Sequence, residues 1–175
     1  MEVIDLISKR FSPREFSAKS ITEEQLLVLL EAAGKAPSAY HEQPWRFIYA
    51  LKDDSEDFQR LLSCLLPGNQ EWARHAAALI ITVVKQHHDR NNKVNVTAKH
   101  DLGLAVGNIS VQAMSMDIYM HQMGGIDLDS IPERLHLPEG YEPVTAIALG
   151  YFEGDMPEKT RLSLNDYAMK GGWKH

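Results

Sequence analysis

Apolar residues recur along the chain at two different spacings, which predict both helices and strands. Apolar positions three and four residues apart on otherwise polar segments predict amphipathic helices at residues 2–9, 22–36, 53–66 and 130–135. Segments rich in β-branched and aromatic residues predict strands at residues 46–51, 76–84 and 142–151. Residues 76–84 are nearly all apolar, which is typical of a central strand buried on both faces.

The longest predicted helix covers residues 101–123 and is apolar or small on almost every face. A helix that is apolar all round is buried all round. It is either the central helix of a monomeric core or part of a dimer interface. We favour the dimer, because a chain of 175 residues has difficulty surrounding such a helix. Gly103 and Gly107 allow close backbone approach on one side, and Gly124 with Gly125 predicts the end of the helix.

Length and composition predict one globular domain over residues 1–175, with 44% hydrophobic and 24% charged residues. The formal net charge of −6 argues against a nucleic-acid partner and makes any local cluster of cations more informative. No apolar stretch approaches the roughly 20 residues that span a bilayer. Cys64 is the only cysteine, and the first ten residues do not resemble a signal peptide. A cytoplasmic location is therefore expected.

Two short basic segments are candidates for binding an anion. The first is Arg10-Phe11-Ser12-Pro13-Arg14, in which two guanidinium groups flank a hydroxyl. It is either an anion site, since guanidinium donates two parallel hydrogen bonds to phosphate, or a pair of solvated charges. The second contains Lys159 and Arg161, which point the same way on an extended chain because they are two residues apart.

A polar loop separates the helix at 22–36 from the strand at 46–51. Pro37 and Pro44 bar a helix between them, and the loop carries Ser38, His41 and Gln43. It is either an ordinary connection with an aromatic residue following it, or a loop that presents polar groups to a bound ring.

Two other groups have simpler explanations. Asn69 is expected to cap a short helix. His87, His88 and Asp89 match no structural zinc spacing, so we expect no metal site there, and the segment is predicted to be a mobile lip.

The polar loop resembles the Pro-Ser-Ser-x-Asn-x-Gln-Pro-Trp signature of the FMN-dependent nitroreductase family. Residues 37, 38 and 43–45 match, whereas Ala39 replaces a serine and His41 replaces an asparagine. Segments 10–14, 123–125 and 159–161 match the same family in the same order. The resemblance therefore covers the chain nearly end to end.

This resemblance implies an α+β nitroreductase-like fold, with a central, mostly antiparallel sheet flanked by helices and a long buried central helix. It also implies a homodimer that exchanges C-terminal tails. The implied FMN-binding residues belong to the matching segments and to the position before the central strand: Arg10, Phe11, Ser12, Arg14, Pro37, Ser38, Ala39, His41, Gln43, Asn69, Met123, Gly124, Gly125, Lys159 and Arg161.

The resemblance also gives these residues roles. Arg10, Ser12 and the basic pair at 159–161 would hold the phosphate side of FMN. Arg14 would lie toward the phosphate or the pyrimidine edge. Arg14 or a neighbouring cation would stabilise negative charge on the reduced ring. Asn69 would contact the flavin or its ribityl chain, and the backbone of 123–125 would face N5 and O4. The loop at 37–39 would reach the partner's flavin.

The implied function is NAD(P)H-dependent, two-electron reduction of a nitro compound, quinone or similar small acceptor. The flavin carries the redox chemistry, so no catalytic triad is expected. We expect ping-pong turnover, since one flavin face must serve donor and acceptor in turn. Reductive dehalogenation or flavin breakdown on the same fold, and a non-enzymatic FMN-binding protein, remain alternatives. Neither the acceptor nor the choice between NADH and NADPH follows from the sequence.

Overall fold

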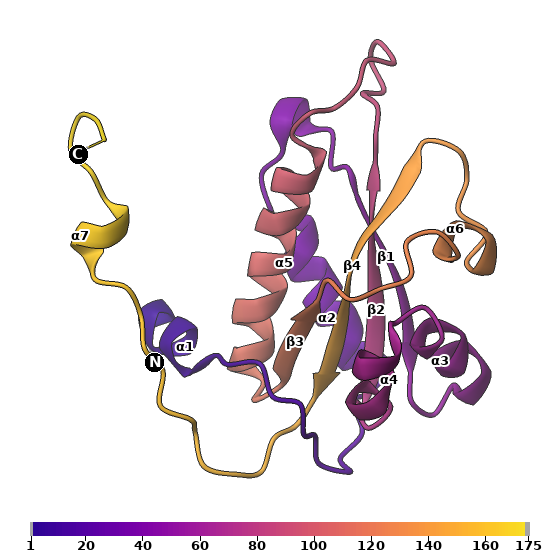
Figure 1. Ribbon diagram of the computed structural model, residues 1–175, viewed down its shortest axis with the longest axis vertical. Helices are drawn as coiled ribbons and strands as arrows, with labels where there is room; N and C mark the ends of the chain where they lie inside the picture. The colour runs from indigo at the N-terminus through magenta and orange to yellow at the C-terminus, as the bar shows by residue number, and fades with distance from the viewer. Residues whose placement is uncertain (1, 174–175) are drawn as a thin grey trace.

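Four strands form one antiparallel sheet in the order β1-β2-β4-β3 (Figure 1), in a computed structural model that describes residues 2–173. The strands are β1 (Trp45–Leu51), β2 (Ala78–Lys85), β3 (Tyr119–Met123) and β4 (Tyr141–Gly150). Every strand pairing is antiparallel. The structure therefore confirms the α+β class and the antiparallel sheet predicted from the sequence.

Helices cover both faces of the sheet (Figure 1). On one face lie α2 (Glu23–Gly34) and α5 (Ala98–Ser115), and on the other lie α3 (Ser55–Leu62), α4 (Pro67–Ala73) and α6 (Ile131–Arg134). Each side has its own cluster of buried apolar side chains, and β2 contributes alternate residues to both. This explains why β2 is apolar without alternation, because both of its faces are buried.

The helix α2 begins as its sequence predicts. Thr22 accepts a hydrogen bond from the amide of Gln25, and the Gln25 side chain accepts from the amide of Thr22, which together form a capping box. Leu26, Leu29 and Ala33 form the buried face of this helix. This face packs against α5, which places both helices over the sheet.

The long helix predicted at 101–123 is wrong at its C-terminal end. The helix α5 ends at Ser115, and after a turn the chain continues as β3, which pairs with β4. The turn depends on Asp117, whose φ of 54° lies in the left-handed region and cannot continue a right-handed helix. Consequently Gly124 and Gly125 follow a strand and do not end a helix.

The prediction that this helix is buried all round does not hold within one chain. Ala105, Ile109 and Ala113 are fully buried on the side that faces the sheet and α2. On another side Gly103, Leu104 and Gly107 are exposed. Among residues 2–173, one side of α5 is therefore left uncovered.

The two ends of the chain lie apart from the sheet. The helix α1 (Val3–Lys9) contacts α5 but contains no buried residue. The C-terminal segment, with the short helix α7 (Leu164–Tyr167), leads away from the rest of the chain (Figure 1). Four of its large apolar side chains are exposed, namely Leu162, Leu164, Tyr167 and Trp173. Within residues 2–173, no helix has the length and apolar character needed to cross a membrane.

Candidate functional site

A hollow of about 280 Å³ opens beside α5, between this helix, β3 and the segment that follows α1. Arg10 and Ser12 line it from the segment after α1, and the Arg10 guanidinium donates a hydrogen bond of 3.3 Å to the Ser12 hydroxyl. Gly103 and Gly107 line it from α5. A Cβ added to either glycine would meet nothing within 4 Å, so these glycines leave room for a ligand against the helix backbone.

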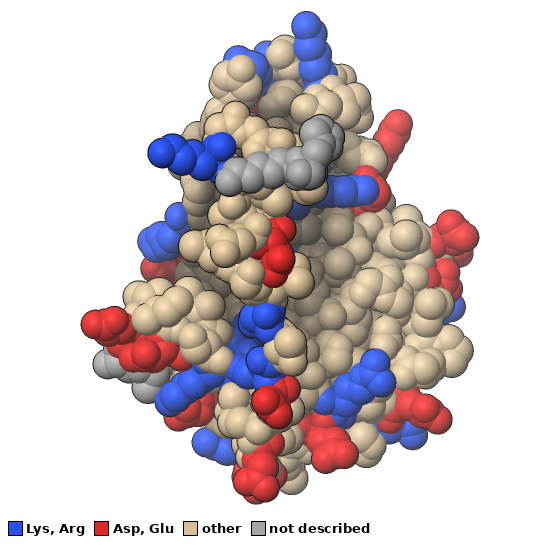
Figure 2. All heavy atoms as spheres, turned by 60° about the vertical axis from the view of Figure 1, so that its left-hand side comes forward, with Lys and Arg blue, Asp and Glu red and all other residues tan. Residues whose placement is uncertain are grey.

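Arg10 lines this hollow, whereas Lys159 and Arg161 do not line it but lie near Arg10. The Lys159 ammonium donates to the backbone carbonyls of Ser8 and Arg10, so the segment after β4 lies against the segment after α1. Partial burial, together with the charges of Arg10 and Arg161, lowers the pKa of Lys159 below its ordinary value. The mutual repulsion of these cations would be relieved by a bound anion. On the face turned forward in Figure 2, Lys and Arg side chains gather beside a hollowed, uncharged surface.

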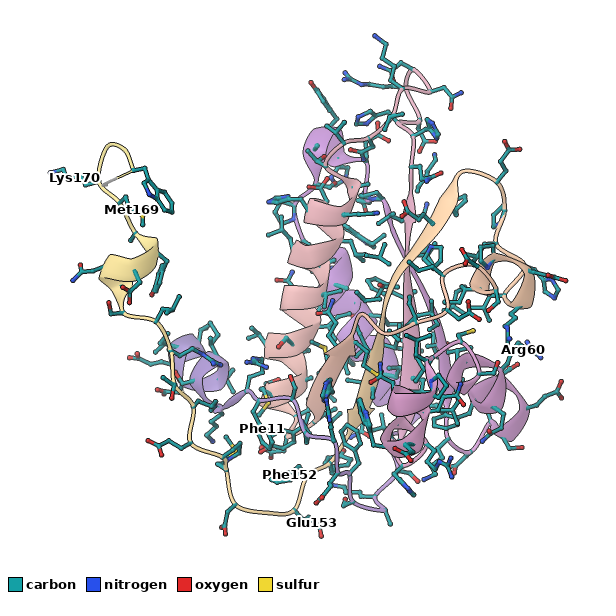
Figure 3. The ribbon with its side chains drawn as sticks, viewed as in Figure 1. Phe11, Arg60, Phe152, Glu153, Met169 and Lys170 are labelled. Carbon is teal, nitrogen blue, oxygen red and sulfur yellow. The ribbon has the colours of Figure 1, made fainter. Side chains whose placement is uncertain are left out.

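Two residues of the first basic segment do not line the hollow. Phe11 is buried in a cluster with Tyr119 and Phe152, at ring-centroid distances of 5.1 and 4.9 Å (Figure 3). Its side chain therefore packs the segment onto the body. Arg14 is exposed and donates no hydrogen bond to any residue that the structure describes.

The strand β3 connects the hollow to the glycine pair. Met120 and Gln122 line the hollow, and Met123 ends the strand directly before Gly124 and Gly125. The Gln122 amide donates to the Thr145 hydroxyl at 3.2 Å, which fixes its orientation at the edge of the sheet. Residues 123–125 do not line the hollow themselves, and β3 joins them to the two residues that do.

Asn69 lies beside the glycine pair, and the prediction that it caps a helix is wrong. Leu66 is the N-cap of α4, with Pro67 at the first helical position, and Asn69 lies within the first turn. Its side-chain amide donates to the carbonyl of Gly125 at 3.0 Å. A Cβ at Gly125 would lie 2.5 Å from the same amide nitrogen, so a larger residue there would force the Asn69 side chain to move.

The polar loop at 37–44 lies near the N-terminal end of α5. It contains the short 3₁₀ helix η1 (Ala39–His41), although the two prolines do bar an α-helix. The Ser38 hydroxyl accepts from the amide of Gln43 at 2.9 Å, and the side chains of Gln43 and His41 are 3.0 Å apart. No residue of this loop, Pro37, Ala39 and His41 included, lines the hollow beside Arg10. One chain therefore does not bring the loop and the cations together.

The segment with His87 and His88 packs against this loop. The amide of Asp89 donates to the Glu42 carboxylate at 2.9 Å, and His88 Nδ1 lies 3.3 Å from the same carboxylate. The Arg90 guanidinium lies 3.6 Å from the centre of the Tyr40 ring. Across the described part of the chain, no three His, Cys, Asp or Glu residues are grouped to hold a metal ion.

Several residues that line the hollow were not predicted from the sequence as binding residues, among them Gly103, Gly107, Ser110, Met120 and Gln122. The four-residue spacing of the two glycines gave a usable signal, because it marks a helix side open to close approach. Gln122 gave none, since its position depends on β3, which was predicted as helix.

The residues present suit a ligand that combines a phosphate with a flat, polar ring. Three cations and a hydroxyl provide charge-assisted donors for the phosphate. The bare α5 backbone at Gly103 and Gly107 and the small Gly124-Gly125 turn leave space for a flat group. The backbone and the Asn69 side chain can then bond its polar edge.

Comparisons with known proteins identify the family of this chain. Residues 7–151 match the sequence model described as the Nitroreductase family. A putative NADH dehydrogenase/NAD(P)H nitroreductase from Archaeoglobus fulgidus is 26% identical over 154 residues, covering 86% of this chain and 85% of that protein. An iodotyrosine deiodinase from Haliscomenobacter hydrossis is 23% identical over 182 residues, covering 86% and 79%. The crystal structure of an oxidoreductase containing FMN superposes with a TM-score of 0.89 at 35% identity, covering 97% of this chain and 91% of that chain.

Proposed function

Because the chain belongs to the nitroreductase family, we propose that it is an FMN-dependent oxidoreductase that passes a hydride from NADH or NADPH to a small acceptor. The observation that carries this proposal is the group of cations formed by Arg10, Lys159 and Arg161 beside a glycine-lined hollow. The Ser12 hydroxyl completes the set of donors. The group fits a phosphate ester such as that of FMN.

The protein's own residues bind and orient the cofactor, which supplies the hydride chemistry when it is bound. Arg10, Ser12, Lys159 and Arg161 would hold the phosphate. The Met123–Gly125 backbone and the Asn69 amide would bond the polar edge of the ring, and the small glycines allow the contact. Arg14 is exposed and free to turn toward the ring, where a guanidinium would stabilise the negative charge that develops on reduction.

We further propose that the functional unit is a homodimer. A hollow of about 550 Å³ lies in a groove between α1, α2 and α5 that is lined by Val3, Leu6, Val28 and Val111. The exposed apolar side chains of the C-terminal segment have no surface of their own chain to cover them. A partner's tail in this groove would bury both apolar surfaces, which monomers rarely leave exposed.

A dimer also accounts for the separation of the two halves of the site. The loop with Pro37, Ser38 and Ala39 does not reach the hollow of its own chain. In a twofold dimer the same loop can approach the partner's hollow, so that each flavin is held by both chains. His41 and Gln43 would follow this loop to the same site.

The acceptor is proposed as a nitro compound, a quinone or a similar small molecule. One rival is reductive dehalogenation, which the similarity to an iodotyrosine deiodinase favours. Initial rates of NADH and NADPH oxidation, measured at several fixed concentrations of nitrofurazone or menadione, test the enzyme. We expect parallel double-reciprocal lines, which indicate ping-pong turnover. No oxidation above that of free FMN would leave only a flavin carrier, and turnover with iodotyrosine alone would favour dehalogenation.

A further inference from the structure

A buried carboxylate connects α5 to the polar loop. Asp101 is 3% exposed and lies in the first turn of α5. Its Oδ2 accepts a 3.0 Å hydrogen bond from the amide of Ala39 and a 3.2 Å bond from the Thr97 hydroxyl. Its Oδ1 lies 3.1 Å from Nδ1 of His100. The N–H groups at the start of the helix also favour a negative charge at this position.

The loop that Asp101 holds has an uncommon backbone conformation. Tyr40, His41 and Gln43 have φ angles of 52°, 59° and 45°, in the left-handed region that side chains other than Gly, Asn and Asp rarely occupy. Such a conformation persists only where the surroundings determine it. The hydrogen bond from Gln43 to Ser38 is internal to the loop, so it cannot fix where the loop lies relative to α5.

We propose that Asp101 is a positioning residue, which holds Ala39 and the loop around it in the place where the loop meets the partner's flavin. This inference rests on the proposed function, because that function gives the loop its role. The carboxylate acts through the Ala39 amide and does not touch the ligand. The sequence could not reveal this link, since the two residues are 62 positions apart.

The expected effect follows from the populations of the loop. Without Asp101, the loop samples other conformations. Only the fraction of protein molecules whose loop is in the correct place can then bind FMN. The apparent dissociation constant rises by the inverse of this fraction. Loss of a charge-assisted hydrogen bond corresponds to a change of about tenfold.

Asp101→Ala and Asp101→Asn test the inference, with Phe58→Leu as the control. Phe58 is a residue of α3 and is 1% exposed, in the apolar cluster on the opposite face of the sheet. Its replacement lowers stability without touching the loop. For each purified dimer, FMN is titrated into the apoprotein by fluorescence, and the visible circular dichroism of the bound flavin is recorded. Hydrogen exchange of the Ala39 amide is measured in the apoprotein.

We expect Asp101→Ala to raise the FMN dissociation constant about tenfold, change the flavin dichroism and accelerate exchange at Ala39. Asp101→Asn should raise the constant about threefold, because the amide oxygen still accepts from Ala39. Phe58→Leu should leave the constant within about twofold. The inference is overturned if the FMN dissociation constants of both Asp101 variants lie within about twofold of that of the natural protein. If Asp101→Ala does not fold, the same result for Asp101→Asn overturns it. An equal rise in Phe58→Leu would also overturn it.

A natural protein that binds no FMN would instead refute the proposed function. Hydrogen exchange of the Ala39 amide, compared between the natural apoprotein and the Asp101 variants, would then still show whether Asp101 orders the loop.

Discussion

The ammonium of Lys159 donates a hydrogen bond of 3.1 Å to the backbone carbonyl of Arg10, from 149 positions further along the chain. It also donates to the carbonyl of Ser8. The segment after the last strand therefore lies against the segment after the first helix. The two basic segments form one positively charged site in a chain whose net charge is −6.

Arg161→Ala should weaken FMN binding far more than it weakens folding. A charge-assisted hydrogen bond contributes about 1.5–3 kcal/mol, so the dissociation constant should rise by roughly ten- to a hundredfold. The free energy of unfolding should change by less than about 0.5 kcal/mol, because the side chain is exposed. Fluorescence titration of the apoprotein measures the FMN dissociation constant, and urea unfolding measures the free energy of unfolding.

Lys52→Ala is the control for this variant, because Lys52 is an exposed cation outside the site. It should leave FMN affinity unchanged. Equal affinity of the natural protein and the Arg161 variant would mean that Arg161 is only a solvated charge.

The affinity for FMN should fall at alkaline pH because of Lys159. Its pKa is lowered in the apoprotein by burial and by the neighbouring Arg10 and Arg161. A phosphate binds the protonated lysine and therefore raises its pKa in the complex. Affinity is then fully present below the lowered pKa of the apoprotein and is lost as pH rises from that value toward the pKa in the complex.

Lys159→Met cannot titrate at this position, so it should bind FMN more weakly and lack this part of the pH dependence. Titrations of both proteins at pH values from neutral to alkaline provide the comparison. If the FMN affinities of the two proteins depend on pH in the same way, Lys159 does not contact the phosphate.

Gly124 and Gly125 should respond differently to alanine, although they are neighbours. At Gly125 the new Cβ would lie 2.5 Å from the Asn69 amide nitrogen, so Asn69 must give up its bond to the Gly125 carbonyl. We expect a loss of about 1 kcal/mol of stability and weaker flavin binding. At Gly124 nothing lies within 4 Å of an added Cβ, so stability should change little. Thermal unfolding of the two variant apoproteins measures these changes in stability. Equal losses of stability in the two variants would contradict the contact between Asn69 and Gly125.

Removal of residues 162–175 should separate the dimer and release the flavin. The deletion takes away the exposed Leu164, Tyr167 and Trp173, which we assign to the partner's groove. An intact interface of this kind would bury more than roughly 2,000 Å². Light scattering should give the mass of one chain for the shortened protein and twice that mass for the natural one. Lys170→Ala, an exposed change in the same segment (Figure 3), should remain dimeric.

A natural protein that is a stable monomer and still holds FMN would contradict the proposed dimer and its shared site.

The sequence predicted the fold well where one local signal dominated. The helical spacing of apolar residues at 22–36 and the nearly continuous apolar run at 76–84 placed α2 and β2 within two residues of their observed bounds. The strand β3 was missed because Ile118, Met120 and Met123 also satisfy helical spacing. The element boundary depends on Asp117, where the chain turns without glycine or proline.

The candidate site could be predicted only in part, for a similar reason. Family resemblance pointed to segments that the structure leaves in separate places: Arg10 and Ser12 line the hollow, Asn69 contacts Gly125, and Ser38 lies in the polar loop. It could not reveal Gln122, whose position depends on pairing with β4, or Asp101, whose role depends on a contact across 62 residues.

The central claim is that NAD(P)H reduces FMN in this protein and that an acceptor then reoxidises it. The most direct measurement is the visible absorption of the purified, FMN-loaded protein without oxygen, after addition of NADH or NADPH and then of menadione. We predict that at least one of the two nucleotides bleaches the yellow flavin band and that menadione restores it. A band that stays unchanged with both nucleotides would contradict the account.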